Sequence, residues 1–333
     1  MMKYIFVLLL GLFLLSSCDK EEVDPDALEI DGGTLSKKFQ FIGRSVGFSV
    51  NQIYVDQTID KNFYLGTVWG LKDTIPTVEL TSLRSHYKPF KITIVPSTTV
   101  ISTAKILPTF DGIRSYARKN KSSALALSGF SITDFFDYES IRYHLNNSPD
   151  VDSVLKLVEH HDSTTIKRAY SCLMRSENIA FSLMAQFNEF SSAFSSKDII
   201  QLKQSGFNPY YTNIVNYGTH VILMGESDYP RIDFKNALDK LLAGNPLTEK
   251  EETILNASDL LIYLRGGRKE SFIKRANGLQ GITKLITEFN KEFEKQRTSF
   301  DFPLSYSLRS LDNFSLLKFW YSYDFLVREE KSN

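Results

Sequence analysis

Tyr217-Gly218-Thr219-His220, followed by the apolar run Val221-Ile222-Leu223-Met224, is the stretch of this 333-residue chain that decides its fold. The apolar run suits a strand buried on both faces, because such strands read as continuous hydrophobic sequence rather than as alternation. His220 invites assignment as a metal ligand or base, but the chain has only five histidines, and the adjacent His160-His161 cannot share a helix face as ligands do. We therefore predict a structural role for His220, with no metal and no cofactor.

The N-terminus has the pattern of an export signal. Lys3 precedes an uncharged apolar run from Ile5 to Leu15. A helix needs about 20 apolar residues to span a bilayer, so this run is too short, and residues 1–17 are predicted to be a signal peptide that is removed. Leu15-Ser16-Ser17-Cys18 resembles a lipobox, which implies that Cys18 is acylated and becomes the mature N-terminus. The alternative is an ordinary secretory signal with an incidental cysteine.

The residues after the cysteine bear on localisation. Asp19-Lys20-Glu21-Glu22 resembles the export signal with which some Gram-negative gut bacteria place lipoproteins on the outer face of the outer membrane. Multiple acyl chains give stable anchoring, so we expect a cell-surface lipoprotein of the outer membrane, with release from the cell as an alternative. The alternative is that these charges form only a solvated tether. Residues 18–38 are then a lipidated acidic tether, and residues 39–333 form the folded domain.

Composition describes an ordinary folded body. Hydrophobic residues make up 42% and aromatic residues 13% of the chain, enough for a large core. Residues 1–17 contain one charged residue, Lys3, so the mature chain carries 38 positive and 39 negative charges, which does not favour nucleic-acid binding. Cys172 is the one thiol left after acylation of Cys18 and is predicted to be a buried apolar residue. The sequence has no P-loop, nucleophile elbow, zinc-ligand spacing or dinucleotide fingerprint, so we predict no enzyme.

The hydrophobic period changes along the chain. Short β-branched and aromatic runs between residues 39 and 107 predict strands, and alternation from Leu125 to Tyr143 predicts another. Ser148-Pro149-Asp150 is typical of a helix start. Further elements are predicted as helices over 147–163, 187–206, 232–257 and 282–293, and as strands over 164–186, 217–230, 259–268 and 303–308.

Tyr217–His220 and the residues that follow resemble the signature of the membrane-attack-complex/perforin (MACPF) family. In that signature an aromatic residue, Gly, Thr or Ser, and His are followed by an aromatic residue, six arbitrary residues and a pair of glycines. Tyr217, Gly218, Thr219 and His220 match its first four positions. Val221 replaces the second aromatic residue, and Asp228-Tyr229 stand where the glycine pair belongs.

The resemblance implies an α+β fold, namely a bent four-stranded antiparallel sheet flanked by two helical clusters. The predicted elements follow the family order, with strands at 125–145, 164–186, 217–230 and 259–268 and clusters at 147–163 and 232–257. Gly266 and Gly267 resemble the glycines at which late strands of this family bend, and glycine suits a sharply curved strand because of its backbone freedom.

The mechanism that the resemblance implies is pore formation without catalysis. Monomers oligomerise side by side, and the two clusters unfurl into β-hairpins that line a barrel through a target membrane, since a closed sheet satisfies every backbone group in lipid. Residues 232–242 partly fit both the helix of the soluble state and the strand of the inserted state. A helical stripe contains Phe234, Leu238, Leu241 and Leu242, and strand parity unites Ile232, Phe234, Leu238 and Leu242. The first cluster is shorter and alternates poorly.

Three function classes remain open on the sequence. The leading one is a surface-anchored, pore-forming antibacterial toxin with an unknown surface receptor. The second is a non-lytic adhesion or binding lipoprotein that uses the MACPF-like fold as a scaffold, which the short first cluster favours. The third is a carbohydrate-handling surface lipoprotein of unrelated fold, which the aromatic content permits and the motif disfavours. Because the apparent domain runs almost to Asn333, we expect no separate targeting domain after it.

Overall fold

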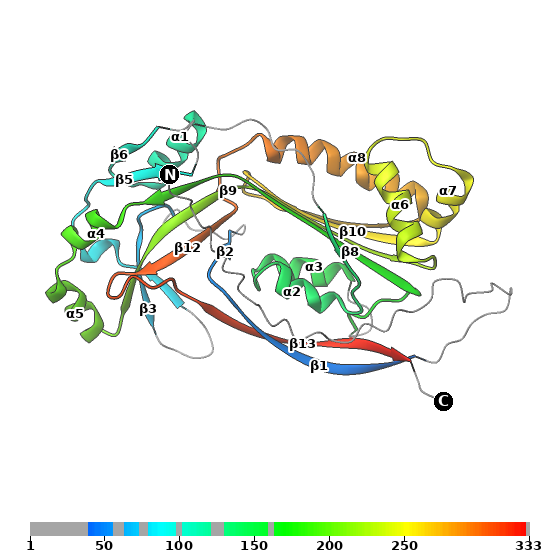
Figure 1. Cartoon of the computed structure of the whole chain (residues 1–333), viewed down its shortest axis with the longest axis horizontal. Helices are drawn as coiled ribbons and strands as arrows, with labels where there is room; N and C mark the ends of the chain where they lie inside the picture. The colour runs from blue at the N-terminus through cyan, green and yellow to red at the C-terminus, as the bar shows by residue number, and fades with distance from the viewer. Residues whose placement is uncertain are drawn as a thin grey trace, which may run out of the picture. The chain divides into compact units, whose positions relative to one another are not determined.

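Two long neighbouring strands organise the structure. The computed structural model describes residues 39–55, 63–72, 79–97, 102–120, 130–158 and 163–330. In it, β8 (Tyr170–Ala185) and β9 (Asn208–Ser227) run antiparallel for most of their lengths (Figure 1). A 20-residue strand extends roughly 65 Å, so different partners pair with its two ends.

These partners build a sheet of 11 strands within the described ranges. Its main path is β11-β10-β9-β8-β5-β6. Strand β7 pairs with the same edge of β8 as β5 does, farther along that strand. The added strands are β2 (Ile53–Tyr54), β3 (Val68–Lys72), β4 (Glu79–Ser82), β5 (Ile92–Pro96), β6 (Ala104–Ile106), β7 (Ser131–Thr133), β10 (Ser258–Arg265), β11 (Phe272–Asn277) and β12 (Ser305–Ser310). The sheet is therefore larger than the four-stranded sheet that the resemblance implied, because β8 and β9 extend well beyond β10.

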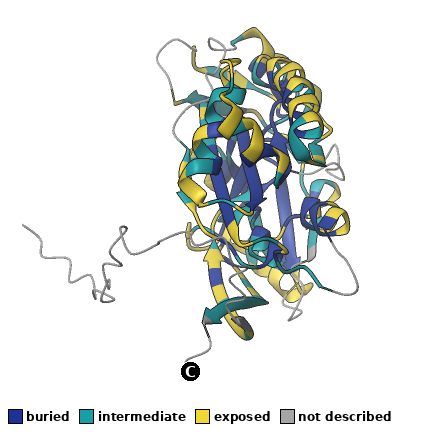
Figure 2. Cartoon of the chain, turned by 90° about the vertical axis from the view of Figure 1, so that its right-hand side faces the viewer, coloured by how far each residue is buried: buried dark blue, intermediate teal, exposed yellow. Residues whose placement is uncertain are grey.

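Helices cover both faces of the sheet where β8, β9 and β10 lie together (Figure 1). The two short elements η2 (Tyr138–Ser140) and α2 (Ile141–His144) with α3 (Asp150–Val158) pack on one face. The other face carries α6 (Arg231–Leu242), α7 (Glu249–Asn256) and α8 (Gly278–Arg297). Figure 2 shows the buried strands between these outer layers.

The sequence of β10 explains this two-sided burial. Leu260, Ile262 and Leu264 pack with α6, α7 and α8, whereas Leu261 and Tyr263 pack with α2 and α3. Successive strand side chains point to opposite faces, so a continuous apolar run supplies both cores.

A third core lies at the other end of β8 and β9. It unites aromatic residues such as Trp69, Phe181 and Tyr211 with the surrounding helices. Those helices are α1 (Phe110–Lys119), α4 (Phe187–Ala193) and α5 (Ser196–Gln204), while the short η1 (Arg84–His86) buries none of its residues.

A separate two-stranded sheet joins β1 (Phe39–Val50) to β13 (Phe319–Glu330). Gly43 lies near Leu326 and Gly47 near Tyr321, so these strands run antiparallel. By internal contacts, residues 40–329 form one compact unit; a second unit comprises residues 1–39 and 330–333, of which only Phe39 and Glu330 are described.

The predicted strand over 125–145 is largely wrong. Of its described part, only Ser131–Thr133 is a strand, and a 3-10 turn and α2 follow. Asp137 begins that turn, since its side chain accepts a hydrogen bond from the backbone N–H of Glu139 (3.0 Å). Phe135 and Tyr138, which are three residues apart, pack into the same core under α3, whereas strand parity would place them on opposite faces.

The other long elements lie where the sequence predicted them, with shifted ends. The strand predicted over 217–230 begins nine residues earlier, at Asn208, and the helix predicted over 282–293 spans Gly278–Arg297. The sequence patterns do not predict α1, β11 or β13. No helix in the described ranges is both long enough and apolar enough to cross a membrane.

Candidate functional site

The motif Tyr217–His220 lies in the middle of β9, where β8 changes register. Tyr217 is buried and stacks on Phe181, with ring centroids 4.9 Å apart. The β8–β9 pairing shifts between Ile179 and Phe181, opposite Gly218. A β-carbon at Gly218 would overlap the carbonyl oxygen of Asn178. Glycine is therefore required at this position by the close approach of the two backbones.

His220 is enclosed by aromatic rings and a guanidinium group. It stacks on Tyr54 (4.8 Å between centroids) and meets Tyr263 edge-on (5.9 Å). Arg175 Nε donates a hydrogen bond to His220 Nε2 (3.1 Å). Burial lowers the pKa of His220 well below its usual 6.5, and the charge of Arg175 lowers it further. The imidazole is therefore neutral at pH 7.

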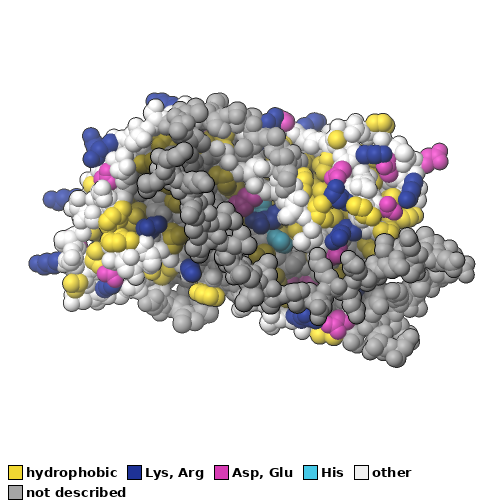
Figure 3. All heavy atoms as spheres, viewed as in Figure 1, with side chains coloured by type: hydrophobic (Ala, Val, Ile, Leu, Met, Phe, Trp, Pro, Cys, Tyr) yellow, Lys and Arg dark blue, Asp and Glu magenta, His cyan; other side chains and the backbone are white. Residues whose placement is uncertain are grey.

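Arg175 joins this histidine to a surface cavity of about 330 Å³. Its guanidinium donates to Tyr54 Oη (3.1 Å) and pairs with Glu177 (2.8 Å). Burial, with the charge of Arg175, lowers the pKa of nearby His144 to about 4. On the face of the molecule drawn in Figure 3, histidine, basic and acidic side chains lie close together near the middle. Across the described ranges, no three His, Cys, Asp or Glu side chains are placed to hold a metal ion.

The candidate membrane-inserting residues of α6 differ in their environments. Phe234 and Leu238 are 1% exposed, and Leu241 and Leu242 pack at the edge of the same core. Ile232 is 59% exposed. A β-carbon at Gly225 of β9 would overlap the ring of Phe234, so the glycine makes room for that ring on the sheet.

Ion pairs and a cap hold α6 and α7 together. Lys240 pairs with Glu251 (2.6 Å) and Lys250 with Asp233 (3.5 Å). Thr248 and Glu251 form a capping box at the start of α7. The hydrogen bond from Lys240 is the main cause that lowers the pKa of Glu251 to about 2, and the hydrogen bonds with Thr248 in the capping box lower it further. The helix pair is thus a defined unit on the sheet.

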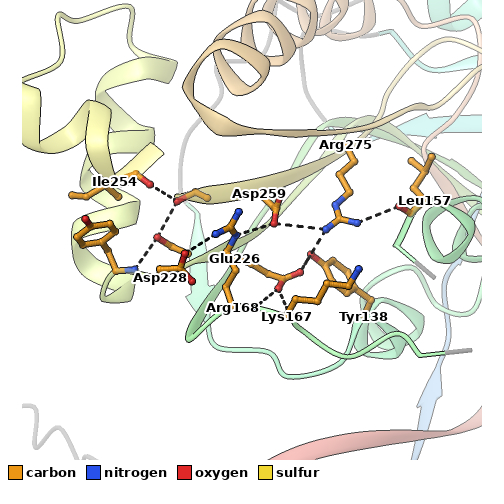
Figure 4. A network of polar contacts seen from close by, with 12 residues as sticks. Tyr138, Leu157, Lys167, Arg168, Glu226, Asp228, Ile254, Asp259 and Arg275 are labelled. Carbon is orange, nitrogen blue, oxygen red and sulfur yellow. Dashed lines mark hydrogen bonds and ion pairs between the residues drawn. The ribbon is translucent and has the colours of Figure 1, made fainter. Parts of the chain in front are cut away.

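A buried carboxylate at the end of β9 forms a second polar cluster, which sequence reasoning missed (Figure 4). Glu226 is 1% exposed and accepts hydrogen bonds from Tyr138 Oη (2.8 Å) and from the backbone N–H groups of Lys167 and Arg168. Arg168 in turn pairs with Asp259 (2.9 Å). The only sequence signal was a single acid inside a buried strand, and a strand pattern does not show its partners.

Cys172 lies on β8 under α6, in the core that contains Phe234. It is a free thiol, 1% exposed, and burial raises its pKa to about 11. The thiolate is the reactive form, so this thiol is inert while α6 is docked.

The remaining sequence-predicted positions are placed as follows. Gly266 and Gly267 come directly after β10, where a β-carbon on Gly267 would overlap the backbone of Ser299; their bending role stays a prediction. The lipidation and export positions, Cys18 with Asp19, Lys20, Glu21 and Glu22, lie outside the described residues, as do His160 and His161.

Buried His220 and half-buried His144 predict an acid-sensitive fold. The folded chain holds His144 and His220 neutral, whereas the unfolded chain binds protons below about pH 6.5, so the free energy of unfolding falls as pH drops from 6.5. Each histidine contributes up to about 1.4 kcal/mol per pH unit, and for His144 the loss ends near pH 4. Urea unfolding at pH 7, 6 and 5 measures this slope. His144→Gln should reduce this slope and leave the contribution of His220, whereas His86→Gln, at the exposed His86, should leave the slope unchanged.

Phe234 and Ile232 form a matched pair for testing how α6 is held. In a chain that starts at Asp19, Cys172 is the only thiol. Phe234→Ala removes the ring seated over Gly225 and should speed maleimide labelling of Cys172 roughly a hundredfold. Ile232→Ala, on the exposed face, should leave the labelling rate unchanged. Equal rates in both variants would contradict the assigned packing of α6.

Comparison with known proteins gives no sequence relative. No protein-family model matches the chain, and no curated protein is significantly similar to it. The fold, however, matches solved toxin structures.

A non-hemolytic pneumolysin from Streptococcus pneumoniae strain ST306 matches with a TM-score of 0.63 at 15% identity over 87% of this chain. The cytotoxin suilysin from Streptococcus suis matches with 0.62 at 13% identity, and a structure described as a Gram-negative toxin with 0.57 at 15%. The matches cover 66%, 66% and 67% of those proteins, so the chain spans about two thirds of their length. The chain thus has the fold of these solved toxins.

Proposed function

We propose that this protein is a lipid-anchored surface toxin that oligomerises and inserts its flanking helices as β-hairpins into the membranes of competing bacteria. Anchoring would come from acylated Cys18, and a surface receptor would select the target. The similarity of the fold to solved toxins supports pore formation. The way in which the helices connect the strands of the sheet supports membrane insertion.

The position of α6 and α7 is the main support for insertion. The two helices connect β9 to β10, which are neighbouring antiparallel strands whose last shared pair is Ser227 with Ser258. Residues 228–257 between them number 30, or 15 for each arm of a hairpin. A membrane strand needs only about 9–11 residues. Extension of this segment would therefore lengthen an existing hairpin without any change of strand order.

The first cluster has the same arrangement. Strands β7 and β8 are paired, with Thr133 opposite Leu173, and the intervening residues 134–169 number 36. This segment contains α2 and α3. Both helical clusters thus lie between strands that already form hairpins in the soluble sheet.

The pattern of α6 partly suits a membrane strand. Ile232, Phe234 and Leu238 share one parity, which Asn236 and Lys240 interrupt. The charged residues Asp233, Lys235 and Asp239 occupy the other parity. In a barrel, one parity faces lipid and the other faces the lumen.

One observation favours the second candidate, a non-lytic adhesion or binding lipoprotein on the same scaffold. Residues 249–252 of α7 are Glu-Lys-Glu-Glu, so both faces of an extended strand would carry charge there. Charges facing the lipid oppose insertion.

Ile232 separates these two functions. Its side chain is exposed in the soluble form, so Ile232→Lys should leave folding unchanged, yet the lysine would face lipid in the pore at a cost of about 2–4 kcal/mol near the bilayer midplane. Leakage of dye from liposomes of bacterial lipids should fall at least tenfold. Ile200→Lys on α5 is the matched control, because Ile200 is 55% exposed outside both clusters. Leakage by the wild type that Ile232→Lys does not reduce, or no leakage at all, would favour the non-lytic function.

The anchor has its own test. Cys18→Ala should abolish incorporation of labelled palmitate in the producing cells and move the protein out of the outer-membrane fraction. Cys172→Ala should change neither, since Cys172 is buried. Protease treatment of intact cells then distinguishes the outer face from the inner face. Unchanged fractionation of Cys18→Ala would overturn the lipoprotein assignment.

A further inference from the structure

We propose that the cavity beside Arg175 binds a small hydrophilic organic anion that carries a carboxylate or phosphate group. The cavity, of about 330 Å³, lies where the start of β2, the turn between α2 and α3, and the middle of β8 come together (Figure 1). Its volume is at the lower end of the range for small-molecule sites, about 300–1,000 Å³. Such a site would serve the soluble form, whether or not the protein forms pores.

The lining of the cavity is unsuited to an apolar ligand. Eight of its nine residues have polar or charged side chains, and the exception is Val50. A lipid tail in the cavity would leave these polar groups without hydrogen-bond partners, which costs free energy. The ligand that fits is therefore hydrophilic.

The charged residues of the lining favour a negative ligand. Arg175 and Lys318 supply two positive charges and Glu177 one negative charge. Glu177 already pairs with Arg175 (2.8 Å). The side chain of Lys318, just before β13, makes no ion pair or hydrogen bond with any residue that the structure describes. The lining thus carries one uncompensated positive charge, which attracts an anion.

The guanidinium of Arg175 has donors to spare for that anion. Its Nε donates to His220, and its Nη2 donates to Tyr54 and Glu177. Its Nη1 has no hydrogen-bond partner within the described ranges, and the side chain is 30% exposed. Because a guanidinium can donate through all five of its N–H bonds, those of Nη1 remain available to a carboxylate or phosphate oxygen in the cavity.

The walls of the cavity are already fixed before a ligand binds. Tyr54 is 3% exposed and stacks on the fully buried His220, so both groups that Arg175 contacts beside Glu177 are held by packing. Asn146 Nδ2 donates to the backbone carbonyl oxygen of Gln52 (2.9 Å), which joins two other parts of the lining. Donors that are already oriented lose little conformational entropy on binding. The contact between His220 and Arg175 therefore positions the guanidinium for the anion.

Calorimetric titration with glucose 6-phosphate, citrate and glucose, at matched ionic strength, tests the site. At least one of the two charged probes should bind and glucose should not, and the charged probe that binds distinguishes a phosphate from a carboxylate ligand. Lys318→Gln should weaken its binding roughly tenfold, since one charge-assisted hydrogen bond is lost. Lys119→Gln on α1 is the matched control, because Lys119 is also exposed and has no side-chain partner among the described residues, yet does not line the cavity.

A second variant and a second measurement complete the test. Arg175→Lys keeps the charge but loses the planar fork, so it should also weaken binding about tenfold; if it fails to fold, Lys318→Gln decides. The bound probe should raise the melting temperature of the wild type and of Lys119→Gln more than that of Lys318→Gln, because a ligand that binds only the folded chain stabilises it. Failure of both charged probes to bind, or equal affinities in Lys318→Gln and Lys119→Gln, would overturn the proposal. No membrane is needed, so the result is independent of whether the protein permeabilises liposomes.

Discussion

Burial of β8, β9 and β10 on both faces is the constraint on which the rest of the structure depends. Alternate residues of β10 enter two different cores, one beneath α3 and one beneath α6, α7 and α8. Neither face can lose its helices without exposing a contiguous apolar surface, which monomeric proteins avoid. The helical clusters are therefore structural covers in solution, whatever else they do, and any conversion must supply a new cover.

Buried carboxylates then fix the positions of the helices and loops that cover the sheet. Glu226 binds backbone groups that precede β8, and Asp150 binds β10 and the residue before β11. A buried carboxylate that loses its partners is strongly destabilising, so each contact specifies one position for a loop or helix rather than merely adding stability. The hydrogen bonds of Asp150 at the start of α3 are of this kind, whereas the packing of Leu155 or Val158 would tolerate small shifts.

The sequence predicts those elements of the fold that are marked by the pattern of neighbouring residues, and it does not predict those that are set by contacts between distant residues. The apolar runs of β9 and β10 and the stripe of α8 are local patterns, and they located three long elements. Strand β11 has no such pattern, because Lys274 and Arg275 interrupt it and its position is set by pairing with β10. Likewise, Ile232 and Phe234 share strand parity, and only Phe234 also lies on the helical stripe. The sequence does not show that Phe234 is seated over Gly225, nine residues away, because that contact depends on how α6 packs on β9.

The pairing register of β9 and β10 sets a limit on the hairpin that α6 and α7 could form. Because Ser227 faces Ser258, continuation of the register places Phe234 opposite Glu251 and Asn236 opposite Glu249. Opposed side chains lie on the same face of an antiparallel pair, so the parity that puts Phe234 into lipid also puts both glutamates there. Sliding the hairpin through the bilayer does not remove them, since any window of about ten residues per arm contains them. Insertion in this register therefore requires protonated glutamates, although the pKa of Glu251 is about 2 while Lys240 holds it. A shifted register would avoid this cost, and so would a binding scaffold that leaves α7 in place.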